Sequence, residues 1–155
     1  MENQLGLNKD YAEKMAGMLN AYLSNVQVSY MNVRGYHWNI KGKQFFMLHE
    51  KFEELYDALN EMADEIAERI LMLGGEPVHA FSKYLEMASI PEKEQVSTPE
   101  ETVSEVLSEI RQLLADERKI IEEASENGDD GTVDMVSEFL DAQEKMIWMY
   151  SAWQK

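Results

Sequence analysis

Apolar side chains recur along most of the chain at intervals of three and four residues, which is the spacing of one face of a helix. This pattern predicts four long helices, over residues 8–35, 45–73, 99–126 and 131–153. Nowhere does the chain alternate apolar and polar residues as a half-buried strand would. Four amphipathic helices without strands predict an all-α fold, most simply an antiparallel four-helix bundle that forms a single domain over residues 1–155.

A long connection separates the second and third predicted helices. It covers residues 74–98, is long enough to run along the bundle, and contains a short helical candidate at residues 80–88. The helix that follows has a well-specified start, because Thr98 suits the N-cap, Pro99 suits the first helical position and Glu101 completes a capping box. One long crossover is typical of a ferritin-like bundle. A plain bundle without a cofactor fits the same pattern.

The predicted helix over residues 45–73 has two distinct faces. Its apolar residues form a stripe roughly 80° wide, which we expect to pack on the bundle core. Polar residues form a second stripe, centred roughly 150° from the first. The members of this polar stripe are His49, Glu53, Asp57, Asn60, Asp64 and Glu68. Because Phe46, Ala67 and Leu71 share the stripe, it suits an interface better than a solvated surface.

Composition narrows the chemistry and the partners of the chain. It holds 30 acidic and 14 basic residues, a formal net charge of -16, which attracts cations and repels the phosphates of nucleic acid. The lack of cysteine excludes disulfides, thiolate metal sites and a cysteine nucleophile. No apolar run is long enough to span a membrane, and residues 1–14 lack the apolar core of an export signal. We therefore expect a soluble, cytoplasmic protein with no membrane partner.

The histidines limit the metal sites that one bundle can form. Ferritins commonly build a di-iron site inside the bundle from Glu-x-x-His motifs on two helices. The one formal match here runs from Glu76 to His79 and lies beside Pro77, outside the long predicted helices. Only His37 and His49 are left. A site of four carboxylates and two histidines inside the bundle therefore cannot be assembled, which disfavours an ordinary ferritin mechanism.

The polar stripe offers a site between two chains instead. Asp64 and Glu68 lie one turn apart and can hold a hard cation. His49 comes 15 residues earlier, about 22 Å away along the helix axis. If two copies of the helix cross antiparallel about a twofold axis near residues 56–58, the histidine of one chain lies opposite the two carboxylates of the other. Each dimer then gains two equivalent sites, and His37 can join His49 in each.

Simpler interpretations of the same residues remain open. Carboxylates four residues apart on a helix are usually solvated, and here Lys51 and Arg69 are available as loose partners. His37, beside Trp38, can equally be a hydrogen-bonded packing residue. Geometry alone does not decide between these interpretations and a metal site.

Three segments around these residues resemble the ferroxidase signature of the Dps family, the mini-ferritins. They are residues 36–42 (YHWNIKG), 45–53 (FFMLHEKFE) and 64–69 (DEIAER). The spacing matches as well, because 12 residues separate the two histidines, and 15 and then 4 more lead to the aspartate and the glutamate. The turn at residues 73–77 is similar to the family's, and the resemblance extends over nearly the whole chain.

The resemblance implies a hollow dodecamer of 23 symmetry that oxidises iron(II), preferably with hydrogen peroxide, and stores iron(III) as a mineral inside. It implies that His37 and His49 come from one subunit. Asp64 and Glu68 would come from its twofold neighbour, with Glu68 bridging two irons if both are bound. Glu53 stands where many relatives have aspartate, which leaves open whether it binds a second iron directly or through water. Zinc or manganese would fit the same ligands without turnover.

Further residues gain roles from the resemblance. Trp38 resembles the family's radical-quenching tryptophan, although packing alone also explains it. Asp129, Asp134 and Glu138 cluster where relatives line a threefold pore with acids, and such a ring would draw iron(II) inward. Helix capping with dipole complementarity is the alternative role, which fully accounts for Asp129 or Asp130 and weakly for Asp134.

One departure from the family concerns DNA. DNA-binding members typically carry a lysine-rich tail, whereas residues 1–14 contain only two lysines, Lys9 and Lys14, against three acidic residues. We therefore expect no direct DNA binding. Nucleoid compaction with incidental metal binding is the alternative function, and a structural cage whose site holds zinc is a third.

Overall fold

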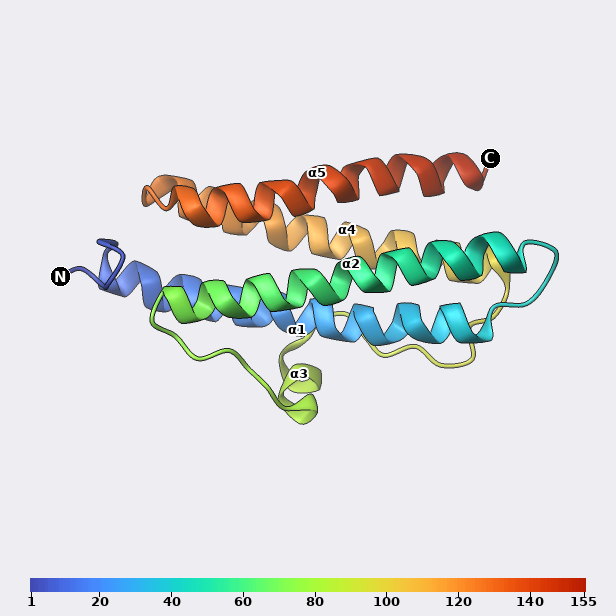
Figure 1. Cartoon of the computed structure of the whole chain (residues 1–155), viewed down its shortest axis with the longest axis horizontal. Helices are drawn as coiled ribbons and strands as arrows, with labels where there is room; N and C mark the ends of the chain where they lie inside the picture. The colour runs from blue at the N-terminus through green and yellow to red at the C-terminus, as the bar shows by residue number, and fades with distance from the viewer.

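The computed structural model describes residues 1–155 as a bundle of helices. Its elements in chain order are α1 (Lys9–Asn39), α2 (Phe45–Met72), α3 (Phe81–Met87), α4 (Pro99–Glu126) and α5 (Asp130–Trp153). Helices α1 and α2 form one antiparallel hairpin, α4 and α5 form another, and the two hairpins pack together along their length (Figure 1). The four long helices confirm the predicted bundle, and α3 confirms the short helix in the crossover.

The starts of three helices are held by side chains that accept hydrogen bonds from otherwise unpaired backbone N–H groups. Asn8 accepts from the N–H of Tyr11 at the start of α1, and Thr98 accepts from the N–H of Glu101 at the start of α4. Asp129 caps α5 in the same way. These bonds satisfy donors that the first turn of a helix leaves free, so the sequence determines where each helix begins.

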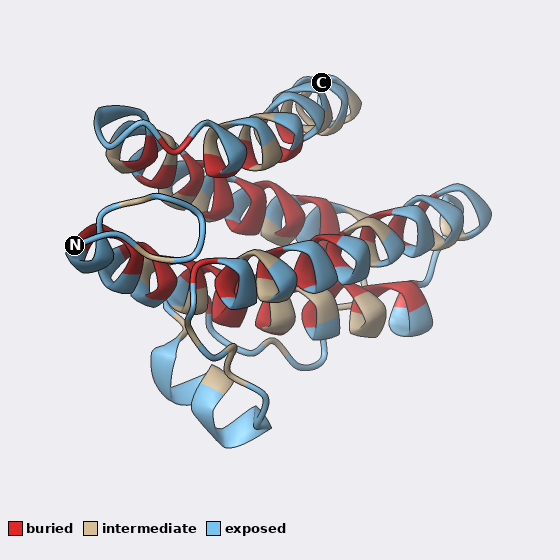
Figure 2. Cartoon of the chain, turned by 60° about the vertical axis from the view of Figure 1, so that its left-hand side comes forward, coloured by how far each residue is buried: buried red, intermediate tan, exposed pale blue.

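A continuous hydrophobic core runs between the two hairpins (Figure 2). The apolar stripe predicted for α2 lies entirely in this core. Its buried members are Leu48, Phe52, Leu55, Leu59, Met62, Ile66, Ile70 and Leu73. Their burial turns the opposite face of α2 outward, so the carboxylates of the polar stripe are exposed. None of the helices is long and apolar enough to cross a membrane.

Helix α1 continues one turn beyond the predicted end at residue 35. The prediction rests on Gly35, because glycine inside a helix costs about 1 kcal/mol relative to alanine. Tyr36 and His37 are nevertheless buried in the next turn, and the N–H of Ile40 donates to the carbonyl of Tyr36 to close the helix. Packing of these side chains outweighs the cost of the glycine. As a result, His37 and Trp38 lie on the last helical turn and not in a loop.

Three asparagines on α1 hold the crossover against the bundle. The side-chain oxygen of Asn20 accepts from the N–H of Val78, that of Asn25 from the N–H groups of Ser89 and Ile90, and that of Asn32 from the N–H of Lys93. The crossover passes along α1 and carries α3 with it (Figure 1), and its second half reaches α4, where Lys93 pairs with Glu105. Helix α3 has no buried residue of its own, so it rests on the surface of α1.

Two carboxylic acids of α4 lie inside the core. Glu117 is completely buried and accepts a 2.6 Å hydrogen bond from the hydroxyl of Tyr22. Glu109 accepts from the amide of Asn32 and from the hydroxyl of Tyr36. Burial raises the pKa of Glu117 to about 8 and that of Glu109 to about 7. Glu117 therefore carries a proton at neutral pH.

Candidate metal site

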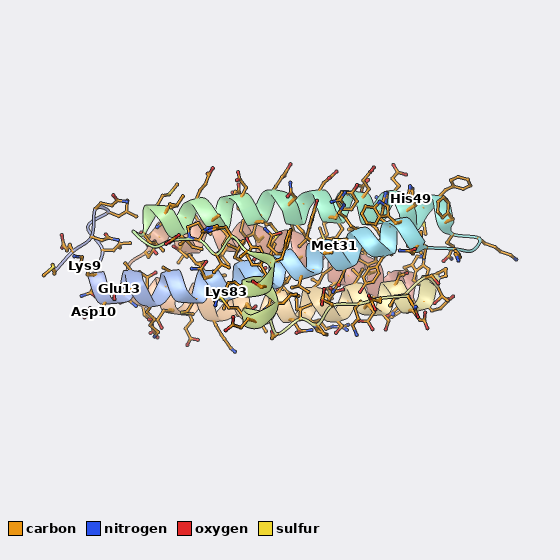
Figure 3. The ribbon with its side chains drawn as sticks, turned by 90° about the horizontal axis from the view of Figure 1, so that it is seen from below. Lys9, Asp10, Glu13, Met31, His49 and Lys83 are labelled. Atoms are coloured by element: carbon orange, nitrogen blue, oxygen red, sulfur yellow. The ribbon has the colours of Figure 1, made fainter.

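The two site histidines meet where α1 ends and α2 begins, near one end of the bundle (Figure 3). The imidazole rings of His37 and His49 are stacked, with their centroids 3.7 Å apart and 12° between their planes. Nδ1 of His37 bonds to the carbonyl oxygen of His49 at 2.6 Å, and Nδ1 of His49 bonds to the carbonyl oxygen of His37 at 2.7 Å. The two bonds are reciprocal, so each ring is oriented by the backbone of the other residue.

This reciprocal pairing fixes the tautomer of both rings. A carbonyl oxygen can only accept, so Nδ1 of each ring must be the donor and must carry a proton. In the neutral ring, Nε2 then keeps a free lone pair, which is the atom that a metal ion binds. Orientation of a ligand histidine through its other nitrogen is the usual outer-shell arrangement of metal sites. The histidine pair is therefore preorganised to act as a donor to a metal.

Aromatic side chains enclose the histidine pair. The ring of Phe45 stacks on His49 with the centroids 4.8 Å apart, and the ring of Tyr56 meets the edge of His37 at 5.3 Å. His37 is 6% exposed, whereas His49 is half-buried. The packing holds the rings in place and leaves His49 as the more accessible of the two.

The structure does not bring the predicted carboxylates to the histidines of the same chain. Asp64 and Glu68 lie in the second half of α2, are exposed, and take part in no ion pair. No group of three potential metal ligands exists anywhere in the single chain. Asp64 comes 15 residues after His49 on one continuous helix, so the carboxylates cannot approach the histidines without a second copy.

Glu53 and Trp38 lie next to the histidine pair. Glu53 is exposed one turn after His49 on the same face of α2, and its Oε1 accepts a 3.4 Å hydrogen bond from the hydroxyl of Tyr56. Trp38 is 54% exposed, and its ring packs against the guanidinium of Arg34 at 4.8 Å. The roles expected of both residues stay predictions.

The three predicted pore acids differ in their surroundings. Asp134 and Glu138 are exposed, four residues apart on α5. Asp129 is instead buried, caps α5, and pairs with the guanidinium of Arg69 at 2.6 Å. Burial would raise the pKa of Asp129, but hydrogen bonds from Thr132 and Tyr11 and the charge of Arg69 hold it below its usual value. Protein donors thus occupy this carboxylate, and the pore hypothesis now rests on Asp134 and Glu138.

Sequence reasoning missed a cationic cluster beside the histidines. Tyr30, Arg34 and Trp38 follow one another at four-residue intervals on α1, and Tyr56 of α2 joins them around the guanidinium. The interval of four residues is visible in the sequence and could have pointed to this cluster. No sequence signal reports the contact with Tyr56, because it depends on the register between α1 and α2.

Comparison with known proteins places this chain in a family. The model of the ferritin-like domain matches residues 16–155. The DNA protection during starvation protein of Porphyromonas gingivalis is 43% identical, over 96% of this chain and 93% of its own length. A Dps crystal structure from Vibrio cholerae is 45% identical, superposes with a TM-score of 0.98, and covers 99% of this chain and 97% of that one. A Dps structure from Bacillus brevis is 34% identical, has a TM-score of 0.92, and covers 96% of this chain and all of that chain.

These likenesses extend over almost the whole chain, well beyond the segments that contain the histidines and the carboxylates. Both the ferritin-like arrangement of the helices and the amino-acid sequence are similar. The chain therefore belongs to the Dps family within the ferritin-like superfamily.

Proposed function

We propose that the chain is the subunit of a mini-ferritin that oxidises iron(II), with hydrogen peroxide as its preferred oxidant, and stores the iron(III) product. The sites are shared between twofold-related subunits of a hollow cytoplasmic dodecamer with 23 symmetry. The Vibrio cholerae relative is described as a member of the ferritin-like diiron-carboxylate proteins, which supports iron as the substrate. The preference for peroxide and the symmetry of the shell rest on the resemblance to the family.

The observation that best supports the proposal is an incomplete set of metal ligands along one face of α2. At one end of this face, His49 and the adjacent His37 of α1 present oriented imidazoles with free Nε2 atoms, and the other end presents two exposed carboxylates without ion-pair partners. A second copy crossing antiparallel near residues 56–58 unites the two ends. A twofold axis completes two identical sites at once, because an isologous contact repeats every pairing.

The donor set suits the proposed chemistry. Imidazole nitrogens and carboxylate oxygens are ligands for iron(II), and the negative charge of the carboxylates favours the iron(III) product. Each iron(II) ion gives up one electron. One hydrogen peroxide molecule takes up two electrons and two protons and becomes two water molecules, so oxidation of two ions balances reduction of one peroxide. In this role His37, His49, Asp64 and Glu68 bind the substrate iron, and Glu53 binds a second ion either directly or through water.

Two double variants test whether each site is shared. One carries His37→Ala with His49→Ala, and the other carries Asp64→Asn with Glu68→Gln. Each variant alone should assemble but lose rapid peroxide-dependent iron oxidation. In a mixed dimer, the histidines of one chain meet the intact carboxylates of the other, which rebuilds one of the two sites. Random pairing makes about half of the dimers mixed, so co-assembled shells should regain about a quarter of the wild-type rate.

The control is a mixture of the two variants after separate assembly. Such shells contain no mixed dimers and should stay inactive. Native mass measurements verify that co-assembled shells contain both chains. If verified mixed shells recover no activity, the two chains do not share each site. If the histidine variant alone keeps the wild-type rate, iron oxidation takes place elsewhere.

A further inference from the structure

Arg34 has hydrogen-bonding capacity that its own chain does not use. It lies on α1 one turn before His37, and its Nη1 donates to the hydroxyl of Tyr30 at 3.2 Å. The guanidinium carbon sits 4.8 Å from the ring centroid of Trp38 and 5.6 Å from those of Tyr30 and Tyr56. Its Nε has no hydrogen-bond partner but is enclosed by its own chain, so an acceptor from outside cannot reach it. Its Nη2 makes no hydrogen bond within the chain and is not enclosed, so this donor is available to an acceptor from outside.

No carboxylate of the same chain pairs with Arg34. Six ion pairs form within the chain, and none includes this guanidinium, although the chain has 30 acidic residues. The carboxylates of the polar stripe on α2 are also unpaired, including Asp64. Gln27 of α1 lines one surface hollow with Arg34 and another with Asp64, so the cation and this free carboxylate lie on the same side of the α1–α2 hairpin. Their charges are complementary if two copies of this side meet.

The register between α1 and α2 shows which carboxylate can reach the guanidinium. His37 contacts His49, and Tyr30 contacts Tyr56, so Arg34 lies at the level of α2 between those two contacts. The twofold crossing proposed above, near residues 56–58, brings the second half of one α2 against the first half of the other. In that crossing, Asp64 of the partner subunit lies opposite the turn of α2 that follows His49.

We infer that Arg34 donates to Asp64 of the partner subunit and positions that carboxylate for metal binding. This inference rests on the proposed shared site. A carboxylate has two oxygens, so one can bind the metal while the other accepts from the guanidinium, which is a common outer-shell arrangement. The three aromatic rings restrict the guanidinium before assembly, so little side-chain freedom is lost when the contact forms. Arg34 is a positioning residue and does not bind the metal itself.

Lysine in place of arginine separates geometry from charge. Arg34→Lys keeps the positive charge but loses the planar fork of Nη donors, so electrostatic repulsion of the metal stays the same while the carboxylate loses its support. Zinc, added to the metal-free assembled protein and followed by titration calorimetry, serves as a probe that does not turn over. We expect Arg34→Lys to weaken zinc binding about tenfold. Arg111→Lys is the matched control, since Arg111 is exposed on α4 and forms no ion pair; it should bind zinc as the wild type does.

A double-mutant cycle without metal identifies the partner. Arg34→Lys, Asp64→Asn and their combination are compared by the urea concentration at which the metal-free shell dissociates. If the two residues are in contact across the interface, the effects are not additive, and the coupling amounts to about tenfold in the subunit dissociation constant. Additive effects, or wild-type zinc affinity in Arg34→Lys, would overturn the inference even when His37→Ala with His49→Ala abolishes zinc binding. If that histidine variant still binds zinc normally, the proposed shared site fails, and the inference fails with it.

Discussion

Each site histidine is held by the backbone of the other, so both depend on the same two helix ends. Nδ1 of His37 and Nδ1 of His49 use the carbonyl oxygens of His49 and His37, respectively. The carbonyl oxygen of His37 is free for this bond because it lies in the last turn of α1, where carbonyl groups have no intrahelical partner. The extension of α1 past Gly35 is thus what makes the pairing possible. Gly35 has a weak helix propensity, but it does not end α1 before the site residues.

Because Glu117 is buried, we expect the free energy of unfolding to depend on pH. Its pKa in the folded chain is about 8, against an ordinary value of 4.5, because burial disfavours the charged form. Between these values the folded state holds a proton that the unfolded state has released. Its contribution to the free energy of unfolding is therefore fully present below 4.5 and is lost as the pH rises to about 8. The loss is on the order of a few kcal/mol, and Glu109 adds to it with the same sign.

Glu117→Gln should remove much of this dependence. An amide is a neutral equivalent of the protonated acid, and it can accept from Tyr22. Urea unfolding at fixed protein concentration, at about pH 5 and about pH 8.5, should show a smaller drop in stability for this variant than for the wild type. Glu122→Gln, exposed on the same helix, should keep the wild-type drop. An unchanged drop in Glu117→Gln would mean that Glu117 is ionised in the folded protein.

At the scale of a single element, the start of α5 combines a structural acid with surface acids. Asp129 accepts hydrogen bonds from the hydroxyl of Tyr11, from the hydroxyl and N–H of Thr132, and from Arg69. These bonds tie α5 to α1 and to the end of α2. Asp134 and Glu138, one and two turns further along, make no such bonds and are exposed. The same stretch of sequence therefore contains residues with separable roles.

Variants of α5 should separate these roles. Asp129→Ala leaves Arg69 without its buried partner and should destabilise the chain by about 3 kcal/mol, measured by urea unfolding. Asp134→Asn with Glu138→Gln should change stability by less than about 0.5 kcal/mol. If these acids line an iron pathway, that double variant should slow oxidation several-fold at low iron(II) and much less at saturating iron(II). Glu122→Gln with Glu126→Gln, exposed at the same spacing on α4, provides the control. Equal rates at low iron(II) would contradict the pore role.

The elements could be predicted from sequence where one local signal dominates. Apolar periodicity placed the core face of α2, and the Thr98 cap with Pro99 placed the start of α4. The end of α1 could not be predicted, because burial of Tyr36 and His37 is a tertiary effect that overrides the local cost of Gly35. The hydrogen bonds from each histidine ring to the backbone of the other histidine depend on the register of α1 against α2. The contacts of the aromatic rings with Arg34 depend on it as well. The apolar periodicity of the sequence does not determine this register. The pairing of histidines with carboxylates requires a second copy of the chain, so it stays a prediction from the shared face of α2 and the family resemblance.

At the scale of the whole molecule, the surface is strongly acidic yet carries many large apolar side chains. Phe46 and Phe81 are 84% and 86% exposed, and Trp148 is 66% exposed. They lie on α2, α3 and α5, so apolar groups emerge on several sides of the bundle. Exposed apolar surface of this extent usually marks an interface, which agrees with assembly into a shell. An assembled shell would cover these groups and leave the acidic residues to set its interactions with other macromolecules.

This acidic surface predicts that the protein does not bind DNA directly. Non-specific DNA binding comes mainly from cations that displace counterions at phosphates, but the chain has 14 basic against 30 acidic residues. Ion pairs with carboxylates already engage six of those 14, namely Lys14, Lys51, Arg69, Lys83, Lys93 and Arg118. The assembled protein should therefore leave the mobility of duplex DNA unchanged at about physiological salt. The assay should include a chelator, because divalent metal can bridge two anionic surfaces, and a lysine-tailed version of the same chain should shift the DNA. A clear shift by the untagged protein in the presence of chelator would favour the nucleoid-binding alternative.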